Sequence, residues 1–176
     1  MKSDDIAGII NVVNLYPVAV DTQQWALFDQ VFTDDIAADF GGVAVWNDLR
    51  SFKAAFEAIH LPFESTQHVT TNHQVALSGP KASCLSYVHG RFIRKVPSGG
   101  DMFESTGWYD DSLVKVSGGW RIRKRVCRMQ WWGGNPAVLE TVPGVKVEQV
   151  VNSLRSEAGA RNIAHVTSLL KAGQPA

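Results

Sequence analysis

The chain has 176 residues, of which 45% are hydrophobic and 19% are charged, and its 17 basic and 17 acidic residues give a formal net charge of zero. This composition predicts one globular domain with a sizeable core and argues against nucleic acid or an anionic membrane as the main partner. Cys84 and Cys127 are too few for a disulfide framework, and their spacing does not suggest a zinc site. The polar, acidic start lacks the pattern of a signal peptide, and no apolar run is long enough to span a membrane, so we expect a cytoplasmic protein.

The first third of the chain has helical patterns. Apolar residues recur at helical spacing over residues 6–20, and we expect a kink or an early end at Pro17. Two shorter helices are expected over residues 22–32 and 47–59, with a short strand over residues 36–40 between them. This part of the chain is therefore predicted to be mostly helical.

From Ser65 onward the hydrophobic pattern changes to the period of two that is typical of strands. Strands joined by short, glycine-rich turns are expected over residues 66–77, 82–96, 102–115 and 120–132. Arg121, Arg123 and Arg125 alternate in the last strand and predict a solvated strand face. Helices followed by strands predict an α+β fold, with a cone-shaped curved antiparallel sheet wrapped around the N-terminal helices and a pocket between them.

The chain changes character again after the last strand. Gly133-Gly134-Asn135-Pro136 interrupts the pattern, so we divide the chain into an α+β domain over residues 1–132 and a helical extension over residues 133–176. Helices are expected over residues 147–154 and 163–170. The extension is predicted to be a lid over the pocket mouth, an oligomer contact or a loosely docked appendage, and the three readings stay open.

Asp21 and His68 form the most informative pair in the sequence. Asp21 lies where one helical pattern ends and the next begins, and His68 lies near the start of the first long strand. A carboxylate that accepts one N–H of an imidazole fixes its tautomer and stabilises the imidazolium, so the pair is a candidate general base. The structural alternative is a buried core histidine and an aspartate that only caps a helix.

Three segments carry a resemblance to a known superfamily. They are Val20-Asp21-x-x-x-Trp25 leading to Thr33-Asp34-Asp35, Thr66-Gln67-His68-x-x-x-Asn72, and Gly107-x-Tyr109-x-Asp111-x-Leu113 followed by Gly119-Trp120-Arg121-Ile122. In this order and spacing they resemble the nuclear transport factor 2-like superfamily, in its SnoaL-like branch. That branch includes scytalone dehydratase, lindane dehydrochlorinase and the bacterial bile-acid 7α-dehydratase. The resemblance covers roughly residues 5–132.

The resemblance implies a cone-shaped barrel with a deep apolar pocket, assembly into trimers or dimers, and no metal or organic cofactor. By position it implies that Asp21 and His68 are the catalytic aspartate and histidine. Tyr16 falls at a functional tyrosine, and Arg128 is the nearest match to a functional arginine in the last strand. Val20 and Phe40 stand where scytalone dehydratase has two tyrosines, so its particular substrate is not expected here.

The expected function is a cofactor-independent elimination on a small apolar cyclic molecule. His68 would remove a proton, Asp21 would hold the imidazole, and Tyr16 with Arg128 would stabilise the developing oxyanion before water or another β-leaving group departs. The side chains expected to line the substrate pocket are Val20, Phe40, Trp46, Phe56, Tyr87, His89, Trp108 and Trp131.

Two other classes of function stay open at this point. One is an isomerase or cyclase that acts on a polyketide-like or steroid-like ligand. The other is a non-catalytic ligand-binding or assembly subunit, similar to the small β subunits of ring-hydroxylating dioxygenases. The second class predicts a filled or closed pocket and a stable partner chain.

Overall fold

A computed structural model describes residues 2–42 and 44–172 of the chain. Two helices precede the first two strands, a third helix follows them, and four long strands come next. In chain order the elements are α1 (Lys2–Asp21), the 3₁₀ turn η1 (Trp25–Leu27), α2 (Phe28–Val31), β1 (Phe32–Phe40), β2 (Ala44–Trp46), α3 (Leu49–His60), β3 (Ser65–Ser78), β4 (Lys81–Ile93), β5 (Met102–Val116), β6 (Gly119–Gly134), the 3₁₀ turn η2 (Pro136–Leu139), α4 (Leu154–Gly159) and α5 (Ala164–Ala172). Among these residues no helix has the length and hydropathy needed to cross a bilayer.

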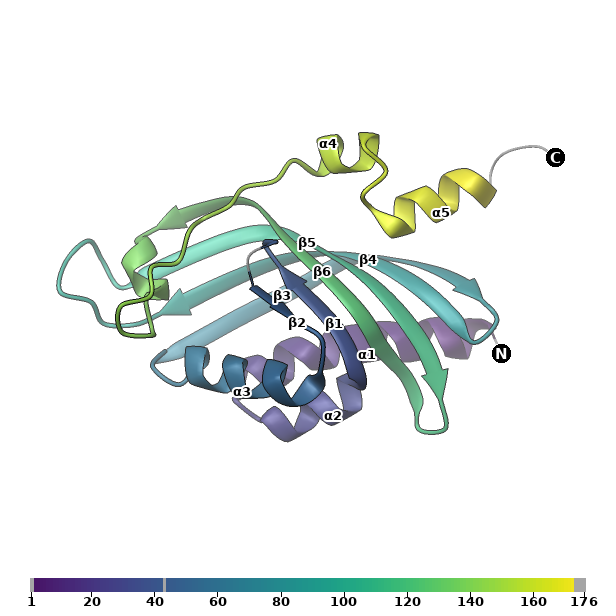
Figure 1. The fold of residues 1–176 in the computed structure, drawn as a ribbon, viewed down its shortest axis with the longest axis horizontal. Coiled ribbons are helices and arrows are strands. Elements are labelled where there is room, and N and C mark those ends of the chain that lie inside the picture. Colours follow the sequence, from purple (N-terminus) through teal and green to yellow (C-terminus); the bar gives the residue numbers. More distant parts are fainter. Residues whose placement is uncertain (1, 43, 173–176) are drawn as a thin grey trace.

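The six strands form one curved sheet in the order β2-β1-β6-β5-β4-β3. The α1, α2 and α3 helices lie on one side of the sheet, and α4 and α5 lie on the other (Figure 1). The α+β class with helices inside a curved sheet is confirmed, although the sheet is mixed rather than wholly antiparallel because β1 pairs in parallel with β6. A parallel pair needs a long connection, and the chain from α3 through β5 provides it.

The α1 helix continues through Pro17 to Asp21, so the expectation that the helix ends early at Pro17 is wrong. Proline removes one intrahelical hydrogen bond, which ordinarily costs a helix about 3 kcal/mol or more. Here one face of the helix is fully buried in the core, through Ile9, Val13, Tyr16 and Val20. This packing outweighs the local preference and brings Asp21 to the end of a continuous helix.

Arg125 is completely buried, so the prediction of a solvated strand face is wrong for this residue. Its guanidinium donates two hydrogen bonds to Asp111, its neighbour across β5 and β6, at 2.8 and 2.7 Å. The same group lies 4.3 Å from the centre of the Tyr16 ring and 4.1 Å from that of Tyr109. A buried cation with a bidentate carboxylate and two aromatic faces is compensated, which explains how an arginine enters the core.

The extension after β6 is held against the domain at separate points. The Arg94 guanidinium donates to the carbonyls of Val138 and Glu140 at 2.8 and 3.0 Å, which holds the end of η2. Further on, Asp110 accepts the backbone N–H groups of Ala164 and His165 at the start of α5. The helix expected over residues 163–170 is thus present as α5, whereas residues 147–153 are not helical. Consecutive valines in that segment disfavour a helix.

Candidate active site

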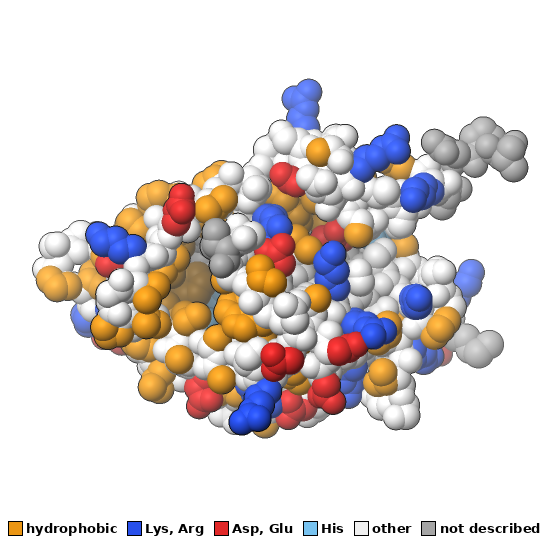
Figure 2. Space-filling view, viewed as in Figure 1, with side chains coloured by type: hydrophobic (Ala, Val, Ile, Leu, Met, Phe, Trp, Pro, Cys, Tyr) orange, Lys and Arg blue, Asp and Glu red, His pale blue; other side chains and the backbone are white. Residues whose placement is uncertain are grey.

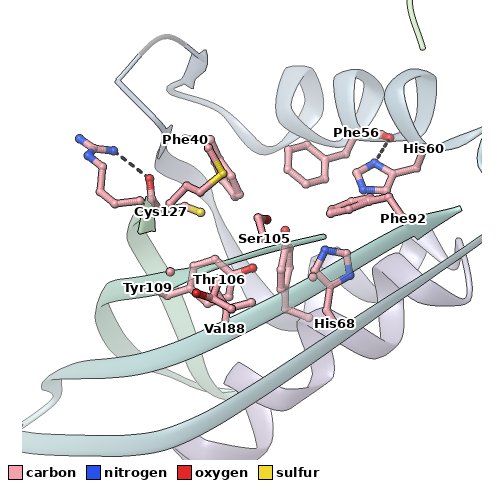
Figure 3. Close-up of a pocket in the computed structure, with 15 residues that line it drawn as sticks. Phe40, Phe56, His60, His68, Val88, Phe92, Ser105, Thr106, Tyr109 and Cys127 are labelled. Atoms are coloured by element: carbon pink, nitrogen blue, oxygen red, sulfur yellow. Dashed lines mark hydrogen bonds between the residues drawn. The ribbon is translucent and has the colours of Figure 1, made fainter. Parts of the chain in front are cut away.

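A cavity of about 200 Å³ lies between the concave face of the sheet and the helices α1 and α3 (Figure 3). Its walls are mainly apolar, with Phe40 from β1, Phe56 from α3 and Val88 from β4. The polar residues on its inner face are Tyr16, His60, His68, Ser105 and Tyr109, and Thr106 and Arg128 also contribute atoms to the lining. A small number of polar groups in an apolar cavity is the usual arrangement of a small-molecule site.

Asp21 and His68 are in direct contact beside this cavity. The Nδ1 atom of His68 lies 2.7 Å from Oδ1 of Asp21, and the backbone N–H of His68 donates to Oδ2 at 2.7 Å. The hydroxyl of Thr66 donates to Oδ1 at 2.9 Å. The carboxylate at the end of α1 is therefore held by three hydrogen bonds from the first residues of β3.

The position of β3 in the sheet explains why the two side chains meet. β3 is one of the two edge strands, so N–H groups on its outer side have no strand partner. The end of α1 packs there, and Asp21 takes the place of a neighbouring strand for the N–H of His68. Burial alone would raise the pKa of Asp21, but the hydrogen bonds from His68 and Thr66 outweigh it and hold that pKa below its ordinary value.

The contact with Asp21 determines which ring nitrogen of His68 carries the proton. An ionised carboxylate can only accept hydrogen bonds, so the neutral imidazole must place its proton on Nδ1. Among the residues that the structure describes, none forms a hydrogen bond with Nε2. Because the side chain lines the cavity and is 7% exposed, its free lone pair is available to a bound molecule rather than to bulk water.

Gly90 leaves the space that the His68 ring occupies. A Cβ atom at this position would lie 3.3 Å from Cδ2 of His68 and 3.1 Å from the ring of Phe92. Both distances are closer than an ordinary van der Waals contact. A glycine at this point of β4 therefore permits the His68 and Phe92 rings to pack close to the strand.

Tyr16 and Tyr109 supply two buried hydroxyl groups to the cavity. They are 1% and 3% exposed, and their rings are 5.7 Å apart in an edge-to-face arrangement. Burial raises the pKa of each hydroxyl above its ordinary value, although the nearby Arg125 guanidinium opposes the rise. Each phenol is thus neutral at physiological pH and can donate a proton or a hydrogen bond.

His60 also lines the cavity, and the sequence analysis did not identify it. Its ring stacks on Phe56, and its Nδ1 atom lies 2.8 Å from the carbonyl oxygen of Phe56, to which it donates (Figure 3). Burial lowers the pKa of His60 to about 4, so the ring is neutral at pH 7. The ring of Phe92 contacts both His60 and His68. The cavity therefore has two imidazoles, and the Phe92 ring contacts both.

Arg128 contributes atoms to the cavity wall, but its side chain lies on the outer face of the sheet with that of Trp108, its partner on β5, and its charge is already paired. Its Nη1 and Nη2 atoms donate to the two carboxylate oxygens of Asp39 at 2.9 and 2.7 Å. The hydrogen bonds from Arg128 lower the pKa of Asp39, so the carboxylate is ionised. This pairing joins β1 to β6 and leaves Arg128 less able to stabilise an oxyanion than a free guanidinium would be.

Several residues that were expected to line the pocket lie elsewhere. Val20 is buried in the core, and Trp46 packs on Phe40 and Phe52 outside the cavity. The four remaining residues point away from the cavity, on the other face of the sheet: Tyr87, His89, Trp108 and Trp131. Alternation explains the error, because Val88, Gly90 and Tyr109 face the cavity and their strand neighbours must face outward.

Part of the missed lining had a signal in the sequence. Phe52, Phe56 and His60 are spaced by four residues, which places them on one face of α3. Cys127 had no such signal; burial raises the pKa of its thiol to about 12, so it is not a nucleophile. Among the described residues, no group of His, Cys, Asp or Glu is arranged to hold a metal ion.

The fold is shared with several solved structures. A scytalone dehydratase candidate from Novosphingobium aromaticivorans has 18% identity and a TM-score of 0.72, with 88% of this chain and 96% of that chain covered. The hexachlorocyclohexane dehydrochlorinase LinA-type3 from Novosphingobium barchaimii has 15% identity and a TM-score of 0.64, with 81% and 92% covered. A nuclear transport factor 2-like superfamily protein from Salmonella enterica has 16% identity and a TM-score of 0.64, with 76% and 93% covered.

At these identities the structural likeness establishes the fold and not the reaction. No curated protein matches the sequence. The model of the SnoaL-like domain matches residues 1–126, which include α1, the whole of β3 and most of the sheet. This match covers well over half of the chain, and it contains both Asp21 and His68. The chain therefore belongs to the SnoaL-like domain family.

Proposed function

We propose that this protein is a cofactor-independent lyase that removes a proton from an apolar cyclic substrate and expels water or another β-leaving group. The observation that carries the proposal is the 2.7 Å contact between Asp21 and His68 at the wall of an apolar cavity. The fold shared with a scytalone dehydratase candidate and a dehydrochlorinase supports the same class of reaction.

The proposed reaction begins at the free nitrogen of His68. Nε2 takes a proton from the carbon next to a carbonyl group of the substrate, and the electrons of the broken C–H bond move into an enolate. Asp21 stabilises the imidazolium that forms, through its hydrogen bond to Nδ1. A base positioned in this way typically contributes about 10²–10⁴-fold to the rate.

The second step expels the leaving group. Enolate electrons form the new carbon–carbon double bond as the bond from the β-carbon to oxygen breaks. The imidazolium returns its proton to the departing hydroxide, which leaves as water, and His68 is neutral again. Tyr16 is placed to donate a hydrogen bond to the enolate oxygen, since its hydroxyl is neutral and buried in the cavity wall.

The cavity favours a catalytic role over that of an assembly subunit. An assembly subunit predicts a filled or closed pocket, whereas this cavity of about 200 Å³ contains a positioned base. Arg128 takes a smaller part than the sequence suggested, because Asp39 holds its guanidinium. Its proposed role is to shape the cavity between β1 and β6.

A panel of cyclic β-hydroxy ketones tests the proposal. We expect wild-type protein to convert at least one of them to the unsaturated ketone, with a loss of mass equal to one water. His68→Ala should abolish the conversion, and His89→Ala, which removes an imidazole from the other face of the sheet, should not. Conversion that survives in His68→Ala, or product of unchanged mass, would contradict the proposed elimination.

A further inference from the structure

A second, larger compartment adjoins the catalytic cavity. Its volume is about 480 Å³, and it lies between the end of α3 and residues 139–148 of the extension. Figure 2 shows a hollow bordered by hydrophobic side chains on this side of the molecule. His60 and Phe92 line both this compartment and the catalytic cavity. The two spaces therefore share these two rings as a common wall.

The catalytic cavity by itself is small for a substrate. An apolar cavity of roughly 150 Å³ admits a single benzene ring, whereas sites for drug-sized ligands span roughly 300–1,000 Å³. At about 200 Å³ the space beside His68 holds the reacting ring and little more. The adjoining compartment falls within the range for larger ligands, so a molecule that extends past Phe92 has room there.

The roof of the compartment presents apolar side chains that are partly exposed. Val142, Val145 and Val147 line it, yet they are 37%, 52% and 40% exposed. The segment that carries them is fixed before them by the hydrogen bonds from Arg94 and after them by the N–H of Asn152, which donates to the carbonyl of Met129 at 2.8 Å. Both ends of the segment that carries the valines are therefore held against the domain.

The charges at the rim indicate an uncharged ligand body. Lys146 and Glu148 are the charged side chains of the lining, and their charges are opposite. The remaining walls are contributed mainly by apolar residues, including Ile59, Phe63 and Leu139. Burying an ionised group against such walls without a partner costs several kcal/mol, whereas hydrocarbon gains roughly 25 cal/mol for each Å² buried.

We propose that this compartment binds the hydrocarbon body of the substrate. The substrate is then an elongated, uncharged molecule with one oxygenated ring beside His68 and the rest of its carbon skeleton under the valines of the extension. This inference rests on the proposed function only in taking the ligand of the catalytic cavity to be the substrate. It assigns residues 139–148 the role of a specificity-determining wall.

Calorimetric titration with three probes tests the inference without any turnover. Progesterone offers a fused-ring body, oleyl alcohol offers a chain, and cyclohexanone fits the catalytic cavity alone. The matched variants are Val145→Asp, in the roof, and Val151→Asp, elsewhere on the extension; each valine is 52% exposed, so both substitutions are compatible with folding.

We expect progesterone or oleyl alcohol to bind at least about tenfold more tightly than cyclohexanone. Val145→Asp should weaken binding of the longer probe about tenfold and leave the affinity for cyclohexanone unchanged, because the new charge faces only the second compartment. Val151→Asp should change the affinity for neither probe. Whichever long probe binds identifies the body as fused rings or a chain. The inference is overturned if neither long probe binds more tightly than cyclohexanone, or if the two aspartate variants behave alike.

The binding pattern also separates this inference from the proposed elimination. His68→Ala should retain the preference for the longer probe, since the second compartment is intact in this variant. If the elimination is disproved while Val145→Asp still weakens the longer probe selectively, the compartment remains a ligand site. If elimination is verified but Val145→Asp does not selectively weaken binding of the longer probe, only the proposed role of the second compartment is disproved.

Discussion

Replacing Asp21 with Asn exchanges one carboxylate oxygen for an amide group and should move the His68 proton from Nδ1 to Nε2. The wild-type carboxylate accepts from the His68 ring, from the backbone N–H of His68 and from the Thr66 hydroxyl. An asparagine has one accepting oxygen and one donating amide. If the oxygen stays on the backbone N–H, the amide group faces Nδ1, which must then accept. The proton moves to Nε2, and the base is lost.

The expected size of the effect follows from that geometry. Loss of the general base lowers kcat/KM by about 10²–10⁴-fold, and a wrong tautomer in a comparable aspartate–histidine pair lies near the upper end of this range. All three groups that bond to Asp21 keep a hydrogen-bond partner in the variant, but that partner is a neutral amide instead of a charged carboxylate. We therefore expect a loss of roughly 1 kcal/mol in the free energy of unfolding and no change of fold.

The assay is kcat/KM on a substrate found by the panel of β-hydroxy ketones, together with incorporation of solvent deuterium next to the carbonyl. Thr66→Val is the matched control, because it removes one hydrogen bond to Asp21 and keeps the carboxylate. We expect it to retain activity to within about tenfold. The role of Asp21 in positioning the imidazole would be refuted if Asp21→Asn incorporates deuterium at the wild-type rate while His68→Ala does not incorporate it.

The stability difference between wild type and Asp21→Asn should depend on pH in one direction. The pKa of Asp21 is lower in the folded protein than its ordinary value of 3.8. A carboxylate with a lowered pKa stabilises the folded state above pH 3.8, and this contribution is lost as the pH falls through the folded-state pKa. The difference in unfolding free energy should therefore shrink below pH 4, as measured by chemical denaturation; a difference that grows as the pH falls below 4 would contradict the lowered pKa of Asp21.

Three further predictions concern the surroundings of the base. Gly90→Ala places a Cβ atom 3.3 Å from the His68 ring, so we expect a fall in kcat/KM with little change in the melting temperature, and an unchanged kcat/KM would show that the ring has space to move. Asp111→Ala leaves the buried Arg125 without its carboxylate and should lower the unfolding free energy by about 3–5 kcal/mol in a denaturant titration, whereas a loss below 1 kcal/mol would contradict that pairing. The folded-state pKa of His60 is lowered from 6.5 to about 4, so unfolding free energy should rise by about 3 kcal/mol between pH 4 and pH 6.5 from this residue; an NMR titration that protonates His60 above pH 6 would contradict it.

The order of elements could be predicted from the sequence because local patterns determine it. The change from helical spacing to alternation at Ser65 corresponds to the start of β3, and the glycine-rich turns correspond to the ends of the long strands. Pro17 shows where local rules fail, since burial of one face carries α1 through it. The parallel pair of β1 and β6 joins distant parts of the chain, and no local pattern indicates it.

The candidate site could be predicted only in part. Alternation groups Tyr87 with His89 on one face of β4, but it does not say which face is inside. The structure places the smaller Val88 and Gly90 inside, because α1 and the His68 ring need that space. The prediction that Arg125 is exposed failed for a related reason. Its partner Asp111 lies opposite it on the neighbouring strand and not near it in sequence, so the sequence does not show that the two pair. A cytoplasmic location and a dimer or trimer stay predictions.

The position of one proton tests the central claim most directly. Nitrogen-15 NMR of the histidine rings at neutral pH distinguishes the two neutral tautomers by the chemical shifts of Nδ1 and Nε2. Our account predicts that His68 carries its proton on Nδ1 in wild type and on Nε2 in Asp21→Asn. A wild-type His68 with its proton on Nε2 would have no free lone pair for the substrate and would contradict the account.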